Sequence, residues 1–193
     1  MEEIEVKYLD IDVGDAQARL AKIGAKKVSD GLIRQKVYDY PDLRLNKMGA
    51  WIRLREEDGK ITLTYKKRLG MKDGVKNDEG MEEVEAGVED FEKTAMIFEK
   101  AGMYLKFYEE KKRITYKKGK LKFDIDIWPI LPAYLEIEGE SWAELDGAAR
   151  LLGLDPKNKK ILSAMQIFDL YGLTEMDYEV LTFEKQIKRQ VRL

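Results

Sequence analysis

Charged and apolar side chains alternate at the start of the chain, in the order Glu3, Ile4, Glu5, Val6, Lys7. A β-strand places alternate side chains on opposite faces, so we expect both carboxylates and the lysine on one face. Carboxylate oxygens are hard ligands for divalent cations, and a lysine beside them is a compact charge for an anion. The chain contains no His and no Cys. Any metal site therefore uses oxygen ligands, which favours Mg²⁺, Mn²⁺ or Ca²⁺.

The absence of His and Cys also limits the reactions that the protein can perform. A chain without His has no Ser-His-Asp triad and no histidine general base, and a chain without Cys has no thiolate nucleophile. Lack of Cys is compatible with a reducing cytosol, so we expect a cytoplasmic protein. The acidic N-terminus predicts no signal peptide, and no apolar run approaches the length of a membrane span.

Length and composition are those of one globular unit that is rich in charge. The chain has 193 residues, of which 44% are hydrophobic and 37% are charged. This length can bury a sizeable core without disulfides. Basic and acidic residues number 35 and 37, giving a net charge of -2. No overall field therefore favours a nucleic acid polymer or an anionic membrane as partner, and any anion site has to be local.

The same alternation continues along most of the chain and predicts a structure built mainly from strands. The Asp58-Gly59 pair is a strong hairpin signal between two such segments. Residues 69–80 are rich in Gly and charge, which predicts a mobile loop. The tail over 174–193 is expected to add a strand or a helix. We expect strands over 3–8, 32–40, 50–56, 60–68, 81–88, 106–117, 120–128 and 134–138, and helices over 13–25, 91–101, 142–152 and 160–171.

Nearly every predicted strand has one ionic face and one apolar face. Such alternation is typical of an open antiparallel sheet with one solvated face. It also fits a closed barrel with an ionic lumen and helices over its apolar outer surface, which would leave no exposed strand edges. The ionic face comprises Glu3, Glu5, Lys7, Arg53, Arg55, Thr62, Thr64, Lys66, Glu83, Glu85, Lys111, Arg113, Lys122, Asp124, Asp126, Glu136 and Glu138.

The order of these charged segments resembles that of the CYTH superfamily, also called the triphosphate tunnel metalloenzymes. The first five-residue segment fits the Glu-x-Glu-x-Lys signature that opens this family. Six later segments resemble its paired-arginine strand, its lysine-bearing strand, its second acidic pair, its second basic pair, its late aspartate and its closing acidic pair. The similarity covers roughly residues 1–170. These six segments are, in order, Arg53-Leu54-Arg55, Thr62-Leu63-Thr64-Tyr65-Lys66, Glu83-Val84-Glu85, Lys111-Lys112-Arg113, Asp126 and Glu136-Ile137-Glu138-Gly139.

The resemblance implies an α+β fold. Its centre would be an antiparallel, eight-stranded, closed β-barrel that forms a tunnel with an ionic lumen, and helices would pack outside. Residues 1–172 would form this domain. Residues 173–193 would be a C-terminal extension and not a separate domain.

The resemblance also implies roles for the ionic face. The cations would bind a small-molecule triphosphate, because arginine forks match pairs of phosphate oxygens and lysine adds point charge. The carboxylates would hold Mg²⁺ or Mn²⁺, with two ions present together with substrate. The triphosphate-binding residues would be Lys7, Arg53, Arg55, Lys66, Lys111 and Arg113; the metal ligands Glu3, Glu5, Asp126, Glu136 and Glu138; and the residues that assist proton transfer Lys7, Glu83 and Glu85.

Three functions remain open at this point. The first is metal-dependent hydrolysis of a triphosphate, either inorganic triphosphate or a nucleoside triphosphate, with thiamine triphosphate as a further possible substrate. The second is the reaction of a class IV adenylyl cyclase, which converts ATP to cyclic AMP and pyrophosphate. The third is binding of polyphosphate or nucleotides without turnover. A homodimer is the commonest default for the oligomeric state.

Overall fold

The computed structural model describes residues 4–69, 71–72, 75–76, 80–174 and 177–190, so the predicted ligand Glu3 lies outside the described residues. The chain divides into two compact units. The first runs to Leu32 and resumes over Lys111–Asp177; the second contains Ile33–Glu110 and the segment from Tyr178 onwards. The strands β2 (Lys26–Asp39) and β8 (Tyr104–Lys118) pass through both units.

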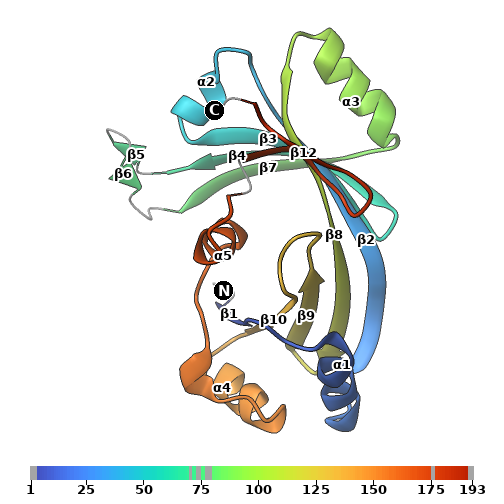
Figure 1. The fold of residues 1–193 in the computed structure, drawn as a ribbon, viewed down its shortest axis with the longest axis vertical. Helices are drawn as coiled ribbons and strands as arrows, with labels where there is room; N and C mark the ends of the chain where they lie inside the picture. Colours follow the sequence, from blue (N-terminus) through green and yellow to red (C-terminus); the bar gives the residue numbers. More distant parts are fainter. Residues whose placement is uncertain (1–3, 70, 73–74, 77–79, 175–176, 191–193) are drawn as a thin grey trace. The chain divides into compact units, whose positions relative to one another are not determined.

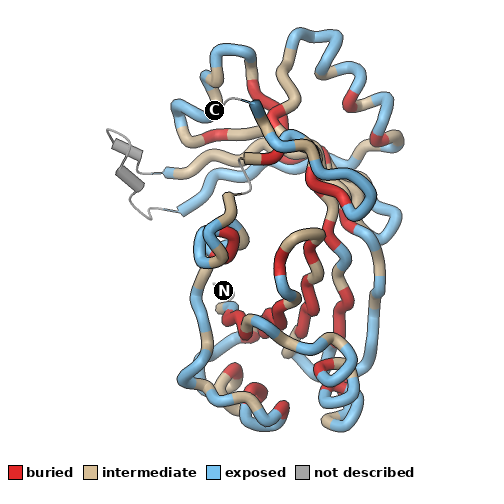
Figure 2. The backbone as a smooth tube through the Cα atoms, viewed as in Figure 1, coloured by how far each residue is buried: buried red, intermediate tan, exposed pale blue. Residues whose placement is uncertain are grey.

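The first unit packs two helices on the apolar face of its strands. Leu20 and Leu145, one from each helix, are fully buried in one core cluster with Phe123 and Ile137. Figure 2 shows the buried residues along these strands in red. The elements are β1 (Ile4–Tyr8), α1 (Val13–Lys22), β9 (Leu121–Ile127), β10 (Tyr134–Gly139), α4 (Trp142–Leu151), the 3₁₀ turn η1 (Pro156–Asn158) and α5 (Ala164–Leu170), of which α1 and α4 are the two covering helices.

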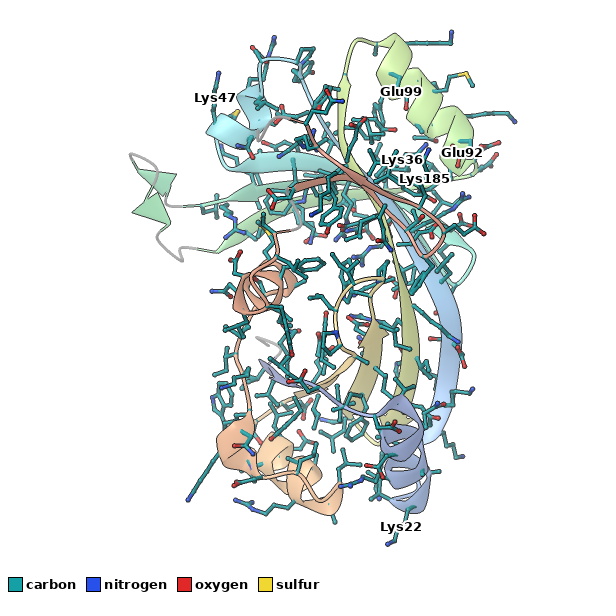
Figure 3. All side chains as sticks on the ribbon, viewed as in Figure 1. Lys22, Lys36, Lys47, Glu92, Glu99 and Lys185 are labelled. Carbon is teal, nitrogen blue, oxygen red and sulfur yellow. The ribbon has the colours of Figure 1, made fainter. Side chains whose placement is uncertain are left out.

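The second unit has one helix on its apolar face. Phe91 and Ala95 of this helix form a buried cluster with Tyr38 and Leu54. Near the helix start, Glu92 forms an ion pair with Lys36 at 3.0 Å (Figure 3). The elements are α2 (Arg44–Lys47), β3 (Ala50–Glu57), β4 (Lys60–Arg68), β5 (Met71–Lys72), β6 (Val75–Lys76), β7 (Met81–Val88), α3 (Phe91–Lys100), β11 (Tyr178–Leu181) and β12 (Gln186–Lys188), with α3 as the covering helix.

The main sheet is antiparallel, so the expected β-rich α+β class is confirmed (Figure 1). Eight strands follow one hydrogen-bonded path in the order β1-β10-β9-β8-β2-β3-β4-β7, and β11 adds to β8 in parallel. Within the described part of the chain, this path begins at β1 and ends at β7 without a pairing that joins them. The closed barrel is therefore not confirmed.

Local signals fixed most element boundaries. The Asp12 side chain accepts the Asp15 N–H and caps α1, and Gly24 adopts a left-handed φ of 78° just after that helix. In the predicted hairpin, Asp58 and Gly59 both have positive φ, of 50° and 74°, as a tight type I′ connection requires. The bounds of α1, and those of the two strands β3 and β4 joined by the hairpin, lie within a few residues of the predicted ones.

Two predicted elements were wrong in extent. β2 begins at Lys26 instead of 32; the prediction missed its first residues because they are largely exposed and lack apolar alternation. The ion pair from Lys112 to Asp30 helps to hold this part of the strand. The last predicted helix begins at Ala164 instead of 160, because Ser163 and Gln166 form a capping box there. Of the predicted loop 69–80, the described part contains the short pair β5 and β6, while residues 70, 73–74 and 77–79 lie outside it.

Two leucines on α4 test how much the core of the first unit contributes to stability. Leu145 is 0% exposed and Leu151 is 63% exposed, so the same change to Ala separates burial from helix propensity. We expect Leu145→Ala to lower the free energy of unfolding by about 2–5 kcal/mol, and Leu151→Ala by less than about 0.5 kcal/mol. Urea unfolding followed by circular dichroism measures both, and equal losses would contradict this packing.

Candidate functional site

Three carboxylates gather on the ionic face of the first unit. Asp124 on β9 pairs across the sheet with Glu136 on β10, and Glu138 lies two residues further along the same face. Each of the three offers an oxygen within 4.8 Å of the others, and both Asp124 and Glu136 are buried. Carboxylates at this spacing repel one another unless cations lie among them. Their hard oxygen donors fit a divalent cation such as Mg²⁺ or Mn²⁺.

Three basic side chains balance these carboxylates in the structure. Lys122 Nζ lies 3.1 Å from an oxygen of Asp124 and 3.1 Å from one of Glu138. Arg113 Nη1 lies 3.0 Å from Asp124 Oδ2, the same oxygen that Lys122 contacts, and Lys7 Nζ lies 3.1 Å from Glu136. A divalent ion at this position would therefore compete with protein cations for the same oxygens.

Lys7 connects Glu136 to the predicted ligand Glu5. Its Nζ lies 2.5 Å from Glu5 Oε1, and the lysine is itself buried. Burial opposes ionisation of Glu5, but the hydrogen bond and charge of Lys7 outweigh it and lower the pKa of that carboxyl. Burial raises the pKa of Glu136, and the charges of Lys7 and Arg113 only partly offset it. Two acidic groups thus share one lysine.

Asp126 has a different environment from the other carboxylates. It is 0% exposed, and Arg113 donates to both of its oxygens at 2.6 and 2.7 Å. Lys111 donates at 2.6 Å and the Tyr134 hydroxyl at 3.1 Å. Burial opposes its charge, yet the neighbouring Lys111 and Arg113 hold the pKa of Asp126 well below its usual value. Its oxygens already hold two cations in place, and its predicted role as a metal ligand remains a prediction.

Support for Asp126 continues outward through aromatic side chains. Trp128 Nε1 donates to the Tyr134 hydroxyl at 3.2 Å, and the ring of Trp128 meets Phe168 of α5 edge-on at 5.3 Å between centroids. Lys111 Nζ lies 5.4 Å from the centre of the Trp128 ring, within range of a cation–π contact. Helix α5 therefore packs beside the charged cluster of its own unit.

The second unit carries a charged face on β3, β4 and β7. Register places Arg53 opposite Thr64, and Thr64 opposite Glu85, whose carboxylate accepts the threonine hydroxyl at 3.0 Å. Lys66 lies opposite Glu83 and pairs with it at 2.8 Å. The predicted proton-transfer residues Glu83 and Glu85 thus lie beside the predicted phosphate-binding cations of this unit.

Arg53 is a half-buried cation with an unused donor. Its Nε is buried without a hydrogen-bond partner among the described residues. Burial, followed by the like charge of Arg55, lowers the pKa of Arg53 to about 10, so the guanidinium stays protonated near neutral pH. Both arginines line a pocket of about 320 Å³. A buried donor without a partner is costly, and an anion in this pocket would satisfy it.

Arg55 is held in place by neighbours in the second unit. Its Nε and Nη2 donate to Gln35 Oε1 at 3.2 and 3.0 Å, and Nη1 lies 3.4 Å from Glu57. Gln35 donates in turn to the buried Glu109. This arrangement fixes the guanidinium on the same face as Arg53.

The structure thus divides the predicted residues into two sets and adds others. Glu5, Lys7, Lys111, Arg113, Asp126, Glu136 and Glu138 lie in the first unit, and Arg53, Arg55, Lys66, Glu83 and Glu85 in the second. Sequence reasoning assigned no site role to Asp124, Lys122 or Tyr134. The period-two pattern placed Asp124 and Lys122 on the ionic face, and Tyr134 shares the parity of Glu136.

Comparison with known proteins decides the family. The sequence profile of the CYTH domain matches residues 1–161. The chain belongs to the CYTH domain family. A protein of Methanocaldococcus jannaschii named as a putative adenylate cyclase is 31% identical over 141 residues, which are 72% of this chain and 77% of that protein. The resemblance drawn from the sequence is therefore confirmed.

Several solved structures of other proteins share the fold. One from Pyrococcus horikoshii has a TM-score of 0.62 at 22% identity and covers 86% of this chain and 99% of its own. A putative adenylate cyclase from Vibrio parahaemolyticus has a TM-score of 0.66 at 16% identity, with 86% and 97% covered. A Hippeastrum protein has a TM-score of 0.60 at 16% identity, with 91% and 99% covered; its structure is described as a putative adenylyl cyclase with a dominant triphosphatase activity.

In the described part of this CYTH chain, no helix combines the length and the apolar character needed to cross a bilayer.

The buried ion pairs of Asp126 should matter far more to stability than an exposed pair. Asp126→Asn removes the charge that Arg113 and Lys111 share, and we expect a loss of about 3 kcal/mol or more in the free energy of unfolding. Glu140→Gln, which breaks the exposed 2.9 Å pair with Lys120, should cost less than about 1 kcal/mol. Denaturant titration of both variants measures the difference. A cost below 1 kcal/mol for Asp126→Asn would refute the supporting role of this carboxylate.

Proposed function

We propose that this CYTH protein hydrolyses a small triphosphate, inorganic triphosphate or a nucleoside triphosphate, in a reaction that depends on Mg²⁺ or Mn²⁺. The observation that carries the proposal is the close set of carboxylates formed by Asp124, Glu136 and Glu138. Membership of the CYTH family supports an enzyme of this class. The Hippeastrum protein, described as having a dominant triphosphatase activity, supports hydrolysis as the reaction.

Asp124, Glu136 and Glu138 would hold the divalent ion. Their donor set consists only of carboxylate oxygens, which suits Mg²⁺ and Mn²⁺ and excludes a preference for soft metals. When bound, such an ion neutralises phosphate charge and makes water a better nucleophile at neutral pH. Further predicted ligands are Glu3, Glu5 and Asp126, and two ions would be present together with substrate.

Basic residues of each unit would bind phosphate oxygens. Lys7 and Arg113 form ion pairs with carboxylates of the proposed metal set. If these carboxylates bound a metal instead, the two side chains could pair with phosphate oxygens. Arg53 would donate its unused Nε–H to a phosphate, with Arg55 beside it in the same pocket. Lys66 and Lys111 are the further predicted phosphate contacts.

Proton transfer would fall to residues beside the cations. Lys7 can donate from its buried ammonium, and Glu83 and Glu85 can accept protons. In the structure Glu83 is paired with Lys66 and Glu85 accepts from Thr64. Each acidic group would have to exchange this partner for a substrate or water to act as a base.

The second candidate is the adenylyl cyclase reaction, which the names of the Methanocaldococcus jannaschii and Vibrio parahaemolyticus proteins favour. It needs the same metals and cations but directs a ribose hydroxyl at the α-phosphate.

Four further features remain predictions. They are closure of the sheet into an eight-stranded tunnel, one domain over 1–172, a cytoplasmic location and a homodimer.

A product analysis with defined substrates and metals tests the proposal. The protein is incubated with tripolyphosphate, ATP or thiamine triphosphate in Mg²⁺, Mn²⁺ or EDTA, and phosphate, pyrophosphate, ADP and cyclic AMP are separated. We expect phosphate release from at least one substrate with metal and none with EDTA. Glu136→Gln should lower kcat about 100-fold or more, because it removes a proposed ligand.

Glu179→Gln is the matched control, since Glu179 is an exposed residue of β11 and has no proposed role in the reaction. Its kcat should equal that of the unchanged protein. Cyclic AMP and pyrophosphate as the sole products from ATP would replace the hydrolase by the cyclase. Tight, Mg²⁺-dependent binding of tripolyphosphate without any cleavage would establish a non-catalytic binder instead.

A further inference from the structure

The first unit has a pocket on the face of its sheet opposite to the charged cluster. Lys7 and Tyr8 are neighbours on β1, so their side chains point to opposite faces, the first to the carboxylates and the second to the helices. Tyr8 and residues of α1 and of the segment after α4 line a cavity of about 460 Å³ there. This volume lies within the range of small-molecule sites.

The floor of this pocket is apolar except for one hydroxyl. Ala16, Leu135 and Leu152 contribute buried apolar surface to it. Tyr8 is only 4% exposed, and its hydroxyl is buried without a hydrogen-bond partner in the described part of the chain. Burial, followed by the charges of Asp146 and Asp155, raises the pKa of Tyr8, so the hydroxyl is neutral. A buried hydroxyl with no partner is costly, and a ligand group could satisfy it.

The rim of the pocket is acidic. Asp12 accepts the Asp15 N–H at 2.7 Å and Asp155 accepts the Lys157 N–H at 2.9 Å, and neither carboxylate forms an ion pair with a described Lys or Arg. The other two rim acids are already engaged: Asp15 binds Arg19 at 2.8 Å, and Asp10 accepts from the Tyr171 hydroxyl at 2.6 Å.

The rim has fewer positive charges than carboxylates. Arg19 and Lys160 are its two cations, and Arg19 also donates to the Leu152 carbonyl at 2.8 Å. The negative charge of Asp12 and Asp155 is therefore available to a bound molecule. The apolar floor, the buried hydroxyl and the acidic rim together suit a ligand that has an apolar body, a polar group and a positive charge.

We propose that this pocket binds a small organic cation. Its ammonium group would lie at the rim between Asp12 and Asp155, its apolar body would cover Leu135 and Leu152, and a polar group at its far end would bond the Tyr8 hydroxyl. The site uses none of the residues proposed for triphosphate hydrolysis and stands independently of that function.

Tyramine is a suitable probe, because it joins an ammonium to a ring that carries a hydroxyl. Isothermal titration in metal-free and phosphate-free buffer should show one site per chain with a Kd below about 1 mM. The matched anion 4-hydroxyphenylacetate should bind at least about tenfold more weakly, because it meets the acidic rim with the wrong charge.

Three variants assign the contacts. Tyr8→Phe keeps the ring and should weaken tyramine binding about threefold to tenfold, the usual effect of one hydrogen bond. Asp155→Asn should weaken it by a similar factor, and Asp169→Asn on α5, outside the pocket, should leave it unchanged. Thermal melting confirms that each variant is folded.

The proposal is overturned if tyramine does not bind at millimolar concentration, or if the cation and the anion bind equally well. It is also overturned if neither Tyr8→Phe nor Asp155→Asn weakens binding. Because neither metal nor triphosphate is present, these outcomes leave the proposed hydrolase activity untouched.

Discussion

Arg113 holds two carboxylates at once, Asp126 through two short N–H···O bonds and Asp124 through a third contact at 3.0 Å. A buried charge is tolerated only when a partner neutralises it, so this guanidinium allows both aspartates to lie inside the first unit. Neighbouring charges oppose its own desolvation and raise the pKa of Arg113 above the ordinary arginine value. The carboxylate cluster therefore exists because a buried cation supports it, and its oxygens could hold a divalent ion.

The two aspartates have different roles: Asp126 holds the neighbouring cations, and Asp124 belongs to the carboxylate cluster. Asp126 accepts hydrogen bonds from Arg113, Lys111 and Tyr134, so its oxygens hold the two cations in position. Asp124 also accepts from Thr115 at 2.6 Å but keeps a carboxylate oxygen close to Glu136 and Glu138. In the second unit, Arg53 Nε is buried without a hydrogen-bond partner among the described residues.

Strand periodicity was enough to predict which side chains share a face. It depends only on the backbone, so Glu136, Glu138 and Asp124 could be placed together before any fold was known. Burial could not be predicted in the same way, because the depth of Asp126 comes from Tyr134 and from the packing of α5, which are tertiary features. The early start of β2 escaped prediction for a related reason, since its exposed residues carry no apolar pattern. The pocket at Tyr8 likewise required segments that are far apart in the sequence.

We expect Asp124, Glu136 and Glu138 to exchange protein cations for a divalent ion in the presence of a triphosphate. Electron paramagnetic resonance of free Mn²⁺ in cold liquid solution measures this exchange when each protein is titrated at a fixed tripolyphosphate concentration. The loss of signal caused by tripolyphosphate alone is subtracted, because this anion chelates Mn²⁺ by itself. We predict a further, saturable loss of the free Mn²⁺ signal with the unchanged protein, and binding at least about tenfold weaker when Glu136 and Glu138 are both changed to Gln. Equal Mn²⁺ affinity of the two proteins would exclude these carboxylates as ligands of the ion.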